Sequence, residues 1–294
     1  MQDRPEPLEG FDEEQYLMLN PDVREAVQNG HFDSGWHHYI THGYDEARAG
    51  VPRQVDAEAV NLLAGPLDWP VPPPHLRQRV GSEDLVNFLS IGQAVASELD
   101  SAISRRFALD PSHQVLDFGC GCGHVFRHFQ PRCNGARLHG TDINAALIAW
   151  CQENLSAIGR FGVSEPLPPL DYPDESFDVV YSVSVFTHLD EDAQFQWLNE
   201  LARITRPGSI LLLSTHGAHL IDHSDPVART NMQNHGFHCS DISSPDRPRE
   251  SNDITSFHTH AYILHNWDRF FEIDTIISRG INDHQDLVIC RNRA

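Results

Sequence analysis

Apolar and polar residues alternate in blocks along residues 115–292, as they do in chains where strands and helices follow one another. Nearly continuous apolar runs, which predict buried strands, occur at 115–118, 136–143, 177–189 and 209–217. Residues 144–155 and 190–208 place apolar residues at helical spacing, with Asn144 as a predicted N-cap and Pro207-Gly208 as a predicted stop. Strands that alternate with helices predict an α/β fold, a mostly parallel sheet with helices on both faces.

The C-terminal third departs from this alternation. Segments 268–280 and 283–292 predict a closing pair of strands. Before them, residues 217–259 are rich in polar and turn-forming residues, and we expect them to be an insertion that forms a lid over the ligand site at the strand ends. The alternative is a disordered surface loop, which residues 247–253 fit locally.

The N-terminal part has a different pattern. Residues 11–48 predict three short helical pieces, separated at Asn20-Pro21, Asn29-Gly30 and His42-Gly43. Proline-rich residues then precede an amphipathic segment that starts at Ser82. We therefore expect a small helical module at 1–50, a linker at 51–80 and the main α/β domain at 81–294.

The most informative stretch is 115–125, VLDFGCGCGHV, where an apolar strand breaks into three glycines. Glycine has no Cβ and tolerates positive φ, so such a loop lets the backbone approach a nucleotide-like ligand closely. Asp117 ends this strand and Asp142 ends the next one, where a carboxylate can accept from the ribose hydroxyls of an adenosine-containing ligand.

These features fit both NAD and S-adenosylmethionine. The two ligands differ in that NAD carries a diphosphate and S-adenosylmethionine carries none. A dinucleotide fingerprint needs G-x-G-x-x-G, but here the third glycine comes one residue early and His124 stands in its place. A carboxylate beside the loop repels pyrophosphate and attracts the ammonium group of a methionine moiety. The pattern therefore favours S-adenosylmethionine.

The ordered set DFGCGCG, GTDI, FDVVYSVSVFTHL and ELARITRPGSILLL resembles class I S-adenosylmethionine-dependent methyltransferases over about 115–291. The resemblance implies a Rossmann-like sheet of seven strands with an antiparallel last hairpin. It also implies a site in which Asp142 holds the ribose, Ile143 packs on the adenine and Ser164 or Glu165 lies at the adenine edge. The other implied cofactor contacts are Asp117, Phe118, Gly119, Cys120, Gly121, Gly123, Ser182 and Val183.

The N-terminal pattern FDEEQYL, NPDV and HYITHG resembles a helical module attached to enzymes of bacterial surface-polysaccharide synthesis. This resemblance implies a carbohydrate or glycan-precursor hydroxyl as the methyl acceptor. It also implies attachment to a partner protein or to a second copy of the chain. A secondary metabolite or a lipid is the alternative acceptor.

Two histidines are candidate catalytic bases, because a neutral hydroxyl acceptor must lose its proton and histidine titrates near neutral pH. His188 follows the fourth strand and His216 lies at the end of the fifth, so both should face the ligand crevice. The alternative for His188 is a capping or packing role. The clusters at 235–239 and 258–265 lack zinc-finger spacing, and we expect no metal site.

Composition narrows the possibilities further. A formal charge of −21, from 42 acidic and 21 basic residues, argues against a nucleic-acid substrate because it repels a phosphate backbone. The six cysteines predict reduced thiols, and no apolar run is long enough for a membrane span, so we expect a cytoplasmic protein. The sequence thus predicts a methyltransferase, with an NAD-dependent oxidoreductase or a non-catalytic scaffold as alternatives from other classes.

Overall fold

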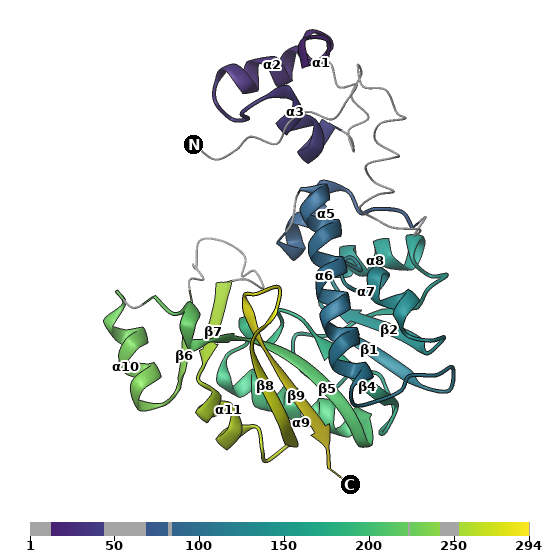
Figure 1. Cartoon of the computed structure of the whole chain (residues 1–294), viewed down its shortest axis with the longest axis vertical. Coiled ribbons are helices and arrows are strands. Elements are labelled where there is room, and N and C mark those ends of the chain that lie inside the picture. Colours follow the sequence, from purple (N-terminus) through teal and green to yellow (C-terminus); the bar gives the residue numbers. More distant parts are fainter. Residues whose placement is uncertain (1–12, 44–68, 82–83, 223, 242–252, 294) are drawn as a thin grey trace. The chain divides into compact units, whose positions relative to one another are not determined.

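The computed structural model of the chain describes residues 13–43, 69–81, 84–222, 224–241 and 253–293 (Figure 1). The chain divides into two compact units, Met1–Gln93 and Ala94–Ala294. Among the described residues, no helix combines the length and the apolar character that crossing a membrane requires.

The first unit is helical. Its helices are α1 (Glu13–Leu19), α2 (Pro21–Gln28), α3 (Gly35–His38), the π-helix η1 (Tyr39–Gly43), α5 (Pro74–Arg77) and the 3-10 helix η2 (Gln78–Val80). Breaks fall at the predicted Asn20-Pro21 and Asn29-Gly30, because proline starts a helix well and glycine adopts the positive φ that ends one. Tyr16, Val23, Trp36 and Tyr39 form a small core of their own.

The second unit is built around one mixed sheet. The strands are β1 (Gln114–Phe118), β2 (Arg137–Asp142), β3 (Arg160–Val163), β4 (Phe177–Ser182), β5 (Thr205–Gly217), β6 (Phe237–Asp241), β7 (Ile254–His258), β8 (Phe271–Ile281) and β9 (Gln285–Asn292). Their order is β3-β2-β1-β4-β5-β7-β6, with β9 antiparallel to β5 and β8 antiparallel to β9. The pairs among β1 to β5 are all parallel.

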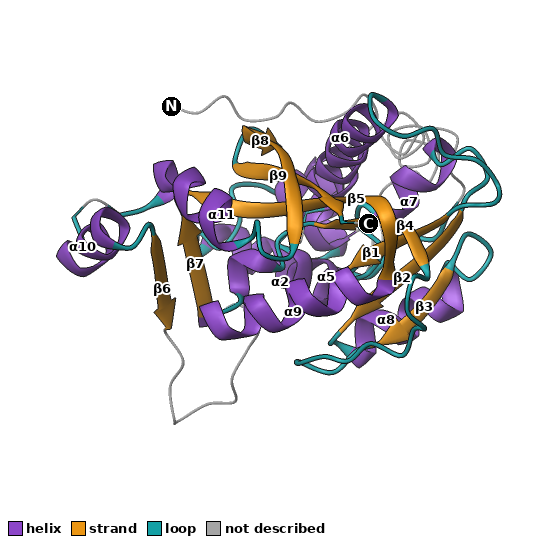
Figure 2. Ribbon diagram, turned by 90° about the horizontal axis from the view of Figure 1, so that it is seen from below, coloured by secondary structure: helices purple, strands orange, loops and turns teal. Residues whose placement is uncertain are grey.

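Helices cover both faces of the sheet, as Figure 2 shows. They are α6 (Leu85–Ser104), α7 (Phe126–Phe129), α8 (Ala145–Asn154), α9 (Glu191–Ile204), α10 (Pro226–Asn234) and α11 (His260–Asn266), with the short 3-10 helices η3 (Gln130–Arg132), η4 (Phe186–His188) and η5 (Ala218–Leu220). Helices α9 and α11 bury Trp197, Leu201 and Ile263 in one core with the central strands. On the other face, Phe129 of α7 packs against Tyr181 of β4.

The predicted fold class is confirmed, with two differences of detail. The sheet has nine strands instead of seven, because segment 217–259 contributes the hairpin β6–β7 to the end of β5. Within that segment, residues 223 and 242–252 lie outside the described residues. Helix α9 ends at Ile204, and β5 already begins at Thr205, so Pro207-Gly208 lies within the strand and does not stop the helix.

Candidate functional site

The glycine loop lies at the carboxyl ends of β1 and β2, where parallel α/β sheets place ligands. Gly119 has a φ of +85°, and a Cβ built on it would lie 2.1 Å from Cγ2 of Val185. The backbone amides of Gly119 and Cys120 both donate to the Thr141 carbonyl oxygen of β2, at 2.8 and 2.9 Å. Glycine at 119 is therefore required both by the backbone conformation and by the contact with the loop after β4.

Asp142 fixes the middle of this loop. Its Oδ2 accepts from the Gly121 amide at 2.9 Å, and its Oδ1 accepts from the Asn144 amide at 2.8 Å. Burial raises the pKa of the Asp142 carboxyl, and these two amides act in the opposite direction. Each carboxylate oxygen has a second lone pair, so the group can still accept hydrogen bonds from a ligand.

Asp117 lies deeper and has fewer partners. Its side chain is buried beside Tyr181, its register partner on β4. Burial raises its pKa well above the usual range, the Tyr181 hydroxyl opposes that rise, and the Asp142 charge adds to it. Neither Oδ2 of Asp117 nor the Tyr181 hydroxyl makes a well-aligned hydrogen bond to the described residues. A buried carboxylate whose polar neighbour is poorly aligned is costly to ionise, and a cationic ligand would offset that cost.

The remaining predicted cofactor contacts divide into two groups. Ile143 is 48% exposed directly after Asp142, and the Ser164 amide donates to the Asp142 carbonyl oxygen at 3.0 Å, so both lie at the carboxyl ends of β2 and β3. In contrast, the side chains of Phe118 and Cys120 are buried. Phe118 packs on Trp197, with ring centroids 4.7 Å apart. These two residues can therefore present only their backbone to a ligand.

The loop after β4 is held by hydrogen bonds to β5 and β9. Ser182 is buried and Val183 is half-buried, while Ser184 has a φ of +60°. The Ser184 amide donates to Oγ of Ser214 on β5 at 2.8 Å. Nε2 of Gln285 on β9 donates to Oγ of Ser184 at 2.7 Å.

The two candidate bases lie close together. Nδ1 of His188 is 2.8 Å from the Ile254 carbonyl oxygen, so Nδ1 carries a proton and donates it, and Nε2 is the acceptor nitrogen of the neutral tautomer. The ring centroids of His188 and His216 are 6.4 Å apart, and those of His216 and His284 are 5.9 Å apart. Burial, followed by the neighbouring His188 and His284, lowers the pKa of His216 to about 4. His216 is therefore neutral at physiological pH.

Sequence reasoning missed the residues that support this site. Tyr181 lies within an apolar strand that gives no sign of its contact with Asp117, and the roles of Ser214 and Gln285 depend on pairings between distant strands. Gln285 is 101 residues away from the serine it contacts. The one local signal was the polar stretch at 282–286, which contains Gln285 and stands directly before the apolar run of the last strand.

The histidine clusters do not form a metal site in the part of the chain that the structure describes. His238 contacts Asn231 and Ser240, and Nε2 of His258 contacts Oε1 of Gln194 at 2.9 Å. These rings are therefore used in hydrogen bonds that connect α10, β6, β7 and α9.

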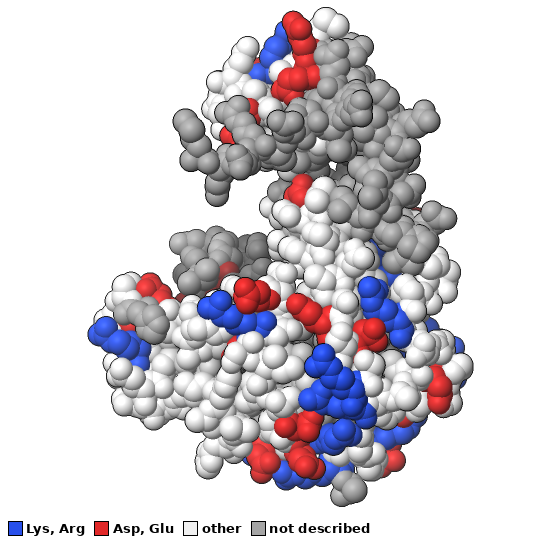
Figure 3. Space-filling view, in the orientation of Figure 1, with Lys and Arg blue, Asp and Glu red and all other residues white. Residues whose placement is uncertain are grey.

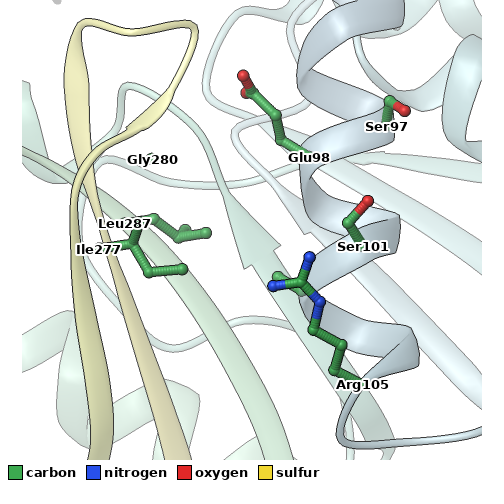
Figure 4. Close-up of a pocket in the computed structure, with 8 residues that line it drawn as sticks. Ser97, Glu98, Ser101, Arg105, Ile277, Gly280 and Leu287 are labelled. Carbon is green, nitrogen blue, oxygen red and sulfur yellow. The ribbon is translucent and has the colours of Figure 1, made fainter.

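A hollow of about 260 Å³ lies away from the glycine loop, between α6 and the β8–β9 hairpin. Figure 4 shows Glu98 and Arg105 projecting from the helix, with Ile277 and Leu287 on the opposite wall. Oε2 of Glu98 accepts from the Asn282 amide at 2.9 Å, and this bond fixes the hairpin turn to the helix. On the face drawn in Figure 3, basic side chains lie among acidic ones.

Residues 115–208 match the family model described as a methyltransferase domain. A malonyl-[acyl-carrier protein] O-methyltransferase of Pectobacterium atrosepticum is 36% identical over 116 residues, which cover 38% of this chain and 43% of that protein. A 2-methyl-6-phytyl-1,4-hydroquinone methyltransferase of Synechocystis is 33% identical over 108 residues, covering 36% of this chain and 33% of that protein. The chain thus spans less than half the length of these two curated relatives.

The fold is also similar to a solved structure, the 1,6-didemethyltoxoflavin-N1-methyltransferase of Burkholderia thailandensis. The TM-score is 0.50 and the identity 14%, and the match covers 78% of this chain and 94% of that one. That crystal structure contains S-adenosylhomocysteine and 1,6-didemethyltoxoflavin. The similarity shows that the two proteins share a fold.

Proposed function

We propose that the chain methylates a hydroxyl group of a carbohydrate or glycan precursor. The premise is that residues 115–208 form an S-adenosylmethionine-dependent methyltransferase domain. The observation that carries the cofactor part is the pair of carboxylates around the glycine loop, Asp117 and Asp142. One is buried without a well-formed hydrogen bond to the described residues, and the other is fixed by two loop amides. Such a pair attracts a cation and repels a diphosphate.

Each side chain then has an assigned task. Asp142 accepts from the ribose hydroxyls, Ile143 covers the adenine and Ser164 lies at its edge. Asp117 and the backbone of the glycine loop hold the methionine end. The fit is supported by the exposed apolar surface of Ile143 and by the buried Oδ2 of Asp117, which makes no well-aligned hydrogen bond to the described residues.

The chemistry on the protein side is positioning and proton removal. The bound cofactor supplies an electrophilic methyl group on a sulfonium. Ser182 and Val183 would border the acceptor and exclude water from it when the cofactor is bound. His188 takes the acceptor proton at Nε2, because its Nδ1 proton is held by the Ile254 carbonyl. His216, uncharged at neutral pH, is the second candidate base.

The acceptor class rests on the resemblance of the N-terminal module, for which we propose attachment to a partner protein or to another copy of this chain. The alternative is a metabolite or lipid, which is supported by the varied substrates in the names of the relatives. A nucleic-acid substrate is disfavoured by the charge of −21. A cytoplasmic location is supported by the six cysteines, which we expect to be reduced thiols.

The experiment is an acceptor screen with S-adenosylmethionine labelled in its methyl group. The full chain is incubated with panels of glycans, small phenols and lipids, and both label transfer and S-adenosylhomocysteine are measured. We expect label in a glycan pool, and loss of at least about tenfold in rate when His188 is replaced by Ala. Label only in phenols or lipids would favour the alternative acceptors. Absence of cofactor turnover with every panel would favour a non-catalytic scaffold.

A further inference from the structure

The segment that joins β4 to η4, Ser182 to Val185, depends on contacts with other parts of the fold. On one side, Cγ2 of Val185 fills the space where a side chain of Gly119 would be. On the other side, Ser184 faces β5 and β9. The segment thus lies between the glycine loop and the C-terminal hairpin.

Ser184 occupies a conformation that a serine rarely adopts by itself. Its φ of +60° lies in the left-handed region, which is unfavourable for a residue with a Cβ. Two hydrogen bonds hold it there, from its own amide to Oγ of Ser214 and from Nε2 of Gln285 to its Oγ. The first bond is to Ser214 of β5, and the second comes from Gln285 at the start of β9.

The Gln285 side chain makes one hydrogen bond through its amide nitrogen and none through its amide oxygen among the described residues. Its side chain is 8% exposed, and its Oε1 is buried without a hydrogen bond to the described residues. An apolar residue at the start of β9 would avoid this cost. The hydrogen bond to Ser184 is the contact that glutamine makes here and that an apolar residue could not make.

We infer that Gln285 is a positioning residue for the cofactor: by holding Ser184, it keeps Val185 against Gly119 and so sets the shape of the cradle for the methionine end. This inference rests on the proposed function, since it assumes that the cradle binds S-adenosylmethionine. Without the Gln285 bond, Ser184 relaxes toward negative φ and Val185 moves off the glycine loop.

The test compares S-adenosylmethionine binding by calorimetry in four full-length proteins. Gln285→Ala should bind about tenfold more weakly than the unmodified chain, the effect of losing one buried hydrogen bond. Glycine adopts positive φ without strain, so adding Ser184→Gly to Gln285→Ala should recover most of the lost affinity. A role of Gln285 in folding alone would not be rescued in this way.

The matched control is Glu98→Ala. It removes the bond from the Asn282 amide, which holds the same hairpin turn to α6 but does not reach the loop after β4. This variant should bind the cofactor like the unmodified chain. Equal affinity of Gln285→Ala and the unmodified chain, or no recovery in the double variant, would overturn the inference.

A failure of the proposed function can be separated from a failure of this inference. If the unmodified chain does not bind S-adenosylmethionine, the cofactor assignment fails, and hydrogen exchange at the Ser184 amide then decides the positioning role. Exchange at least about tenfold faster in Gln285→Ala would support the hold on Ser184. An unchanged exchange rate would refute the positioning role of Gln285 in addition to the cofactor assignment.

Discussion

At the scale of single residues, the two aspartates of the loop differ in what their charge does to stability. Asp117 is buried with a raised pKa, so its ionised form destabilises the fold above the pKa of the unfolded chain. Replacement by Asn removes this charge and should raise the free energy of unfolding at neutral pH by about 1 kcal/mol while weakening S-adenosylmethionine binding. Urea unfolding and calorimetry measure the two effects.

Asp142→Asn provides the contrast in the same loop. Both Asp142 oxygens accept from backbone amides, and an amide nitrogen in place of one oxygen would face another donor. This variant should lose about 1–3 kcal/mol of stability together with its cofactor affinity. A loss of stability in Asp117→Asn as well would show that the Asp117 charge is compensated in the folded protein.

At the scale of elements, the close approach of the glycine loop to the loop after β4 can be measured directly. Gly119→Ala introduces a Cβ that overlaps Val185 at a φ of +85°. Gly208→Ala is its matched control, because Gly208 has a φ of +79° and no atom within 4 Å of an added Cβ. Urea unfolding should show a cost of about 1–2 kcal/mol in the control, and at least about 1 kcal/mol more at Gly119. Equal costs would contradict the contact.

The elements also show what could be predicted from sequence. Periodicity located β1, β2, β4 and β5 and the cap of α8 at Asn144, because these depend on local burial and local hydrogen bonds. The hairpin β6–β7 was not predicted as a strand pair, since its polar residues lack a clear alternation. The hydrogen bond from Gln285 to Ser184 could not be predicted, because it depends on which strands pair across the sheet.

At the scale of the whole molecule, buried histidines predict acid sensitivity. Burial is the main cause that lowers the pKa of His128 and His258 to about 3 and of His216 to about 4. In the unfolded chain these rings have a pKa of ~6.5, so below that pH the unfolded state binds more protons than the folded state does. Stability should therefore fall between about pH 6.5 and pH 4, by up to about 1.4 kcal/mol per pH unit for each fully buried ring.

Thermal unfolding at a series of pH values checks this prediction. His216→Gln should make the decline shallower, because one of the three groups no longer takes up a proton on unfolding. Relief of repulsion among the 42 acidic residues acts in the opposite direction as the pH falls. Stability that rises steadily from about pH 6.5 to pH 5 would mean that this relief outweighs the histidines.

The central claim is that the carboxylate-flanked glycine loop binds a sulfonium cofactor and not a dinucleotide. The most direct measurement is calorimetric titration of the full chain with S-adenosylmethionine and, separately, with NAD. We predict one binding event per chain with S-adenosylmethionine, in the range of about 1–100 μM, and no binding of NAD. Binding of NAD that S-adenosylmethionine cannot displace, with no heat from S-adenosylmethionine itself, would contradict the account.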